Sequence, residues 1–77
     1  MSTVRLFAAV AEAYGADEVR INVADVAALR AQLSERSADA ERIVPQCAVL
    51  RDGHRLDDEA TLADTDVVDV LPPFAGG

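Results

Sequence analysis

The sequence contains no lysine and no tryptophan, and it has one cysteine and one histidine. With a single thiol, Cys47, an internal disulfide cannot form, and one cysteine together with His54 cannot build a structural zinc site. A chain without lysine has no ε-amino group for Schiff-base chemistry or for accepting an isopeptide bond. The sequence also offers no activated nucleophile, no suitably spaced acid–base pair and no phosphate-binding loop, which argues against a stand-alone enzyme.

Positive charge is scarce, because seven arginines face fourteen acidic residues and the net charge is −7. Binding to a phosphate backbone or to an anionic membrane needs the opposite sign, so we expect neither nucleic acid nor membrane as a partner. No apolar run approaches the roughly 20 residues of a membrane span. The apolar stretch at residues 6–11 is too short for a secretory signal peptide, and the unpaired cysteine suits a reducing compartment. We therefore expect a cytoplasmic protein.

The length and the spacing of apolar residues predict one small α+β domain spanning residues 1–77. Alternation of polar and apolar residues predicts strands at 3–7, 18–23 and 67–71. In the last strand Val68 and Val70 then face the core, while Leu71 does not.

Three helical segments are expected between these strands. An alanine-rich helix at residues 8–14 ends at Gly15. Asp25 is a good N-cap for the main helix, which runs to about residue 36 with three apolar residues on one face. A further helical turn or irregular stretch continues to Val44, and Pro45 ends it.

The dipeptide Asp52-Gly53 between two strand-like segments predicts a β-hairpin, since both positions of a two-residue turn need positive φ. This register pairs Arg51 with His54 and turns Cys47 toward the core, where free cysteines are usually found. The acidic run 57–59 has the spacing of no calcium loop, and we expect a solvated turn without a metal.

The last six residues, Pro-Pro-Phe-Ala-Gly-Gly at 72–77, are not expected to form a strand or a helix. Two prolines end strand pairing, and the segment can extend up to about 20 Å. Small residues without a Cβ suit insertion into a narrow active site of another protein. Phe74 is a candidate anchor at that interface.

These features together resemble the ubiquitin-like β-grasp sulfur carriers, and within them the small subunits of molybdopterin synthase. The resemblance rests on Phe-Ala-Ala at residues 7–9, the hairpin at Asp52-Gly53, and Pro-Pro followed by Gly-Gly at the end. It implies a mixed sheet of four to five strands packed against one main helix, with a flexible C-terminal tail. One departure is Thr65-Asp66, where the family commonly has Gly-Asp.

The resemblance implies a carrier without catalytic activity or bound cofactor. An E1-like enzyme that uses ATP would adenylate the carboxylate of Gly77, which a sulfur donor converts to a thiocarboxylate. The sulfur is then delivered to a pterin precursor inside the large subunit of molybdopterin synthase. Gly76 and Ala75 would enter that active site, and Phe74, Pro73 and Leu71 would contact the partner.

Two alternatives stay open. One is a carrier of sulfur for thiamin thiazole, cysteine or another thiometabolite. The other is a ubiquitin-like modifier that is conjugated to lysines of other proteins. The missing lysines would prevent chains of the modifier on itself, but they would not exclude that role.

Overall fold

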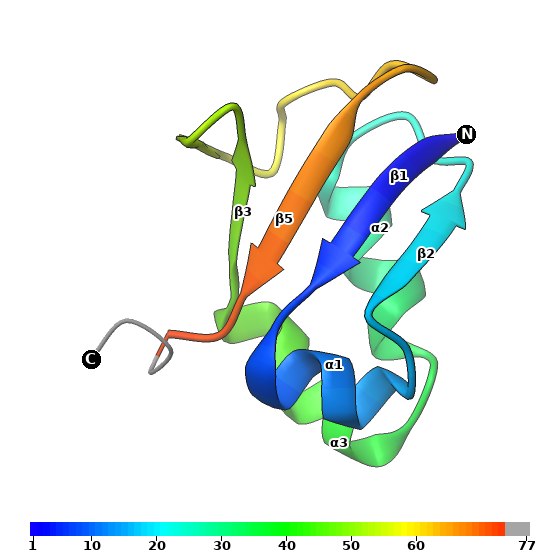
Figure 1. Cartoon of the computed structure of the whole chain (residues 1–77), viewed down its shortest axis with the longest axis vertical. Coiled ribbons are helices and arrows are strands. Elements are labelled where there is room, and N and C mark those ends of the chain that lie inside the picture. The colour runs from blue at the N-terminus through cyan, green and yellow to red at the C-terminus, as the bar shows by residue number, and fades with distance from the viewer. Residues whose placement is uncertain (74–77) are drawn as a thin grey trace.

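The computed structural model describes residues 1–73, and in it five strands form one mixed sheet in the order β2-β1-β5-β3-β4 (Figure 1). The strands are β1 (Ser2–Leu6), β2 (Glu18–Ile21), β3 (Ala48–Arg51), β4 (His54–Leu56) and β5 (Val67–Leu71). The helices are α1 (Ala8–Tyr14), α2 (Val26–Ser34), α3 (Ala38–Ile43) and the 3₁₀ turn η1 (Val44–Gln46). The central strands β1 and β5 are parallel, and every other pair is antiparallel.

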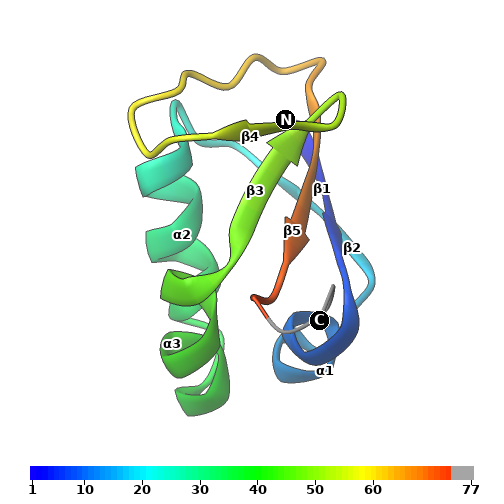
Figure 2. The ribbon, with the colours of Figure 1, turned by 90° about the vertical axis from the view of Figure 1, so that its left-hand side faces the viewer.

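The sheet has one covered face and one open face. Figure 2 shows α2 and α3 on one side of the strands, and Figure 1 shows α1 beyond the end of β1. This confirms the predicted α+β, β-grasp architecture with five strands. The cover differs from the prediction, since α3 packs beside α2 and the main helix does not cover the face alone.

The core lies between the covered face and the helices, as the alternating pattern predicts. Val68 and Val70 are fully buried, whereas Leu71 is only half-buried, and α2 contributes Leu29 and Leu33. The other core side chains are Val4, Leu6, Val10, Ile21, Val26, Ala40, Val44, Cys47, Val49 and Leu62.

The start of α2 agrees with the prediction from the sequence, but its end differs. The Asp25 carboxylate accepts a hydrogen bond from the Ala28 amide at 2.8 Å, which confirms the predicted N-cap of α2. The helix ends at Ser34, before the predicted residue 36, because Ser37 caps a separate helix, α3. Pro45 does not end the stretch as predicted. It lies inside η1, where the first turn tolerates its missing N–H.

Two strands end earlier than the alternation predicts. β1 ends at Leu6 and not at residue 7, because the chain turns sharply at Ala8, whose φ is +52°. β2 ends at Ile21, ahead of the predicted residue 23.

The hairpin between β3 and β4 has the predicted register, with Arg51 opposite His54. Asp52 and Gly53 have φ values of 54° and 78°, as the turn requires. The prediction that Cys47 belongs to the core is also confirmed, because the residue is 2% exposed and its thiol donates to the Ile43 carbonyl at 3.4 Å. Burial raises the pKa of the Cys47 thiol, and the charge of Arg30 opposes this only in part.

The contacts of Asp66 and the backbone of Thr65 explain why the chain does not need Gly-Asp ahead of β5. Its carboxylate accepts hydrogen bonds from the Ala63 amide at 2.9 Å and from the Arg51 guanidinium at 2.7 Å. The backbone of Thr65 does not have a positive φ, so a glycine is not needed there. The Ala63 amide and then the Arg51 guanidinium hold the pKa of the Asp66 carboxyl below its ordinary value.

Candidate functional site

The base of the C-terminal tail lies at the end of β5, beside the middle of the sheet. Leu71 pairs with Ala48 of β3 and is half-buried on the open face. Pro72 is buried, and Pro73 is exposed in a turn. The structure therefore exposes Pro73 and part of Leu71, which are both predicted to contact a partner. The other predicted site residues, Phe74, Ala75, Gly76 and Gly77, lie outside the described residues.

An ion pair occupies the centre of the open face near the tail base. The Arg5 guanidinium donates two hydrogen bonds to the Asp69 carboxylate, at 2.6 Å and 3.0 Å, across the parallel pair β1 and β5. The hydrogen bond and the charge of Asp69 raise the pKa of Arg5. This arrangement uses the planar fork of arginine, which a lysine could not reproduce.

Phe7 belongs to the Phe-Ala-Ala motif at residues 7–9, but the sequence alone did not indicate a role for it at the site. Phe7 is 39% exposed, so a large apolar surface is available beside the tail base. Its amide donates a hydrogen bond to the Val70 carbonyl at 3.2 Å, so the residue is bound to the end of β5, directly before the tail. The period-two pattern of β1, which places Val4 and Leu6 inside, is the signal that could have placed Phe7 outside.

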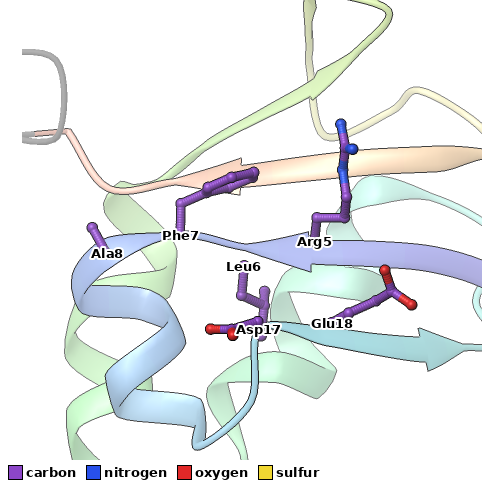
Figure 3. A pocket seen from close by; sticks show the side chains of 6 residues that line it. All are labelled: Arg5, Leu6, Phe7, Ala8, Asp17 and Glu18. Atoms are coloured by element: carbon purple, nitrogen blue, oxygen red, sulfur yellow. The ribbon is translucent and has the colours of Figure 1, made fainter.

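An open pocket of about 390 Å³ lies at this end of β1, lined by Arg5, Leu6, Phe7, Ala8, Asp17 and Glu18. In Figure 3, Arg5 and Phe7 point toward β5, while Asp17 and Glu18 approach from the β2 side of β1. The Asp17 carbonyl accepts a hydrogen bond from the Leu6 amide at 2.7 Å, which fixes the segment that carries both carboxylates. The pocket thus combines an apolar wall with acidic side chains.

The family of the chain follows from a comparison over nearly its whole length. Residues 4–77 match the ThiS family. The chain belongs to the ThiS family. The match reaches Gly76 and Gly77, so it includes the tail as well as the folded domain. A comparison with curated proteins gives no match.

Solved structures from this comparison agree on the fold. A chain in the complex of subunits 1 and 2 of the molybdopterin-converting factor from Helicobacter pylori is 30% identical, with a TM-score of 0.70 over 99% of this chain and 97% of that one. SAMP1 from Haloferax volcanii is 28% identical, with a TM-score of 0.79 over 99% and 98%. The putative molybdopterin converting factor subunit 1 from Pyrococcus furiosus is 24% identical, with a TM-score of 0.81 over 94% and 95%, and supports the fold alone. The chain is thus a ThiS-type ubiquitin-like sulfur carrier by its family, and it has the β-grasp fold of these structures.

The site of this ThiS-family protein contains no recognisable catalytic constellation within residues 1–73. In the same residues, no group of three or more histidine, cysteine, aspartate or glutamate side chains could hold a metal ion. The acidic run 57–59 serves the fold instead, since Asp58 binds the Arg30 guanidinium at 2.8 Å. None of the helices in residues 1–73 is long and apolar enough to span a bilayer.

Proposed function

We propose that this chain is the sulfur-carrying small subunit of a molybdopterin synthase, and that the terminal carboxylate of Gly77 carries the sulfur. The observation that carries the proposal is the match to the ThiS family through Gly77, on a domain whose described residues end at the exposed Pro73. The protein acts in the cytoplasm, with no bound cofactor, and ATP is used by an E1-like activating enzyme.

The chemistry follows from the inertness of a carboxylate. A carboxylate oxygen of Gly77 attacks the α-phosphorus of ATP, pyrophosphate leaves, and a mixed anhydride with AMP forms. A donor equivalent to hydrosulfide adds to the acyl carbon, and AMP departs with the bonding electrons. The product is a thiocarboxylate, which is ionised at neutral pH and is a strong nucleophile.

The tail has the composition that this transfer needs. Gly76 and Ala75 offer little side-chain bulk, so they fit a narrow channel that leads to the precursor. Phe74 and the exposed Pro73 contact the channel entrance, and Leu71 continues the contact on the open face. Inside the large subunit, two sulfurs are delivered in turn to the pterin precursor. In each delivery the thiocarboxylate sulfur displaces an oxygen substituent of the precursor, water then cleaves the acyl–sulfur bond, and Gly77 returns to a carboxylate. The Helicobacter pylori complex of subunits 1 and 2 supports a partner of this kind.

The experiment that tests the carrier is an intact mass measurement of the protein isolated gently from its own cells. We expect a fraction in which one oxygen is replaced by sulfur, mapped by fragmentation to Gly77. Deletion of Gly77 should abolish sulfur loading and leave the thermal midpoint unchanged, since Gly77 carries no side chain to pack in the core. Loading that persists without Gly77 would contradict the proposal, as would a loss of fold in the deletion variant.

The destination of the sulfur is tested by the partner that co-purifies. The large synthase subunit is expected, together with formation of the dithiolene when loaded carrier, large subunit and precursor are mixed. Co-purification with an enzyme that makes thiamin thiazole or cysteine, and no dithiolene, would redirect the proposal to another thiometabolite.

A ubiquitin-like modifier is the second candidate, favoured by the likeness to SAMP1, the small archaeal modifier protein 1 of Haloferax volcanii. In that case Gly77 would be found in amide linkage to lysines of other proteins. Peptide mapping of high-mass adducts in a native lysate distinguishes this role from that of a carrier.

A further inference from the structure

The pocket at the end of β1 is lined by two carboxylates and one arginine. Within residues 1–73, neither Asp17 nor Glu18 forms an ion pair. Arg5 lies opposite Glu18 in the β1–β2 register, and the charge of Glu18 adds to the rise in the Arg5 pKa, but the Arg5 guanidinium is bound twice to Asp69. The positive charge of Arg5 is therefore already balanced, and the pocket keeps an excess of negative charge.

The pocket combines its acidic side chains with an apolar wall. Phe7 presents an aromatic ring that is 39% exposed, and Ala8 beside it is exposed as well. Glu35 and Glu41, on the helix side, are exposed acids that do not line this pocket. A ligand that fits the pocket needs an apolar stem and a cationic end.

We propose that the pocket binds an arginine side chain of the enzyme that receives the tail, an inference that rests on the proposed carrier function. The methylene stem packs against Phe7 and Ala8. The guanidinium has five N–H donors in a planar fork, enough to bond the carboxylates of both Asp17 and Glu18. Charge-assisted hydrogen bonds of this kind are among the stronger polar contacts in proteins.

The position of the pocket connects it to the tail. The Phe7 amide is bonded to the Val70 carbonyl, and Pro72 follows two residues later. Whatever protein surface surrounds the tail base is therefore next to the pocket. A bound arginine would fix the orientation of the domain while the tail occupies the active site, so we assign a positioning role to Asp17 and Glu18.

The backbone is strained at Ala8, beside the aromatic wall of the pocket. A non-glycine residue with a φ of +52° is uncommon and costs free energy. The turn at Ala8 ends β1 and leaves the Phe7 ring on the open face, where it lines the pocket. The strained residue therefore lies where the aromatic wall is formed.

The first experiment needs no partner enzyme. The full chain, labelled with ¹⁵N, is titrated with N-acetyl-L-arginine amide and, separately, with the citrulline analogue, which has nearly the same shape and no charge. We expect saturable shifts of the amides of residues 7, 8, 17 and 18 with arginine only. Shifts that are absent from these amides, or equal with citrulline, overturn the proposal.

Matched variants separate the pocket from the general acidity of the protein. Asp17→Asn combined with Glu18→Gln should abolish the shifts, and Glu35→Gln combined with Glu41→Gln removes two charges elsewhere and should preserve them. With the purified large subunit, the pocket variant should bind about tenfold more weakly, and the control should stay within about twofold. Equal losses in the two variants would reduce the effect to net charge and overturn the proposal.

The outcomes for the pocket and for the carrier function remain distinguishable. If capped arginine binds and no thiocarboxylate is found on Gly77, the carrier function fails while the pocket stands. If the thiocarboxylate is found and capped arginine does not bind, the pocket proposal alone fails.

Discussion

The two faces of the sheet differ sharply although the same strands build both. In β5, Val68 is fully buried, while its neighbour Val67 is 46% exposed. The covered face carries apolar residues that pack under α2 and α3, whereas the open face carries the Arg5–Asp69 ion pair at its centre. One alternating sequence thus supplies the core with one set of residues and the surface with the other.

The difference indicates a division of labour in this ThiS-family protein. The covered face holds the free energy of folding, because apolar burial is concentrated there. The open face and the adjoining pocket are available for recognition, and the proposed chemistry takes place at Gly77, in neither face. Changes on the two faces should therefore affect different measurements.

The largest effect on stability is expected in β5, where the same valine-to-alanine change is made at a buried and at an exposed position. Val68→Ala should lower the free energy of unfolding by about 2–3 kcal/mol, because it leaves a cavity in the core. Val67→Ala should change it by less than about 0.5 kcal/mol. Urea denaturation measures both, and equal losses would show that the open face contributes to folding as much as the covered one.

The next effect concerns binding. Phe74→Ala should weaken the affinity for the large subunit by about 1–2 kcal/mol if Phe74 is an interface anchor, with no change in the thermal midpoint. Val67→Ala is the matched control, since it removes exposed apolar surface at the start of β5, at the opposite end of the strand from the tail. Calorimetric titration distinguishes the two. Unchanged affinity of the Phe74 variant would remove that residue from the interface.

A smaller effect is expected where the open face meets α1. Ala8→Gly should raise the free energy of unfolding by up to about 1 kcal/mol, because glycine relieves the positive φ but gains freedom in the unfolded chain. Ala9→Gly, one residue later inside the helix, should instead lower it by about 0.5–1 kcal/mol. Equal losses of stability in the two variants would show that the positive φ of Ala8 does not destabilise the fold.

The smallest effect on stability is expected at Asp66, and it should depend on pH. The folded protein holds the pKa of Asp66 below its ordinary value, so this carboxylate stabilises the fold above about pH 4, its unfolded range. The stabilisation is lost as the pH falls through the lowered pKa. Asp66→Asn should therefore lower the thermal midpoint at neutral pH, and the difference from the natural protein should shrink in acid. A difference that is constant down to about pH 2 would assign the effect to packing.

Local signals in the sequence predicted the features that depend on neighbouring residues. The Asp52-Gly53 turn fixed the register of β3 and β4, and Asp25 marked the start of α2. The family and the tail motif were also readable, because Pro-Pro and Gly-Gly are contiguous. The prediction for Pro45 was wrong because a local rule against proline in helices cannot tell an α-helix from the first turn of η1.

The sequence by itself therefore determined the strands of one domain, the side of β5 that is buried and the tail motif that is included in the match to the ThiS family. Only the tertiary structure brought Phe7, Asp17 and Glu18 to one pocket and placed it beside the end of β5. The physical reason is distance along the chain. Alternation and turn preference act between residues a few positions apart, whereas the pocket depends on the pairing of β1 with both β2 and β5, and β5 lies more than sixty positions further along.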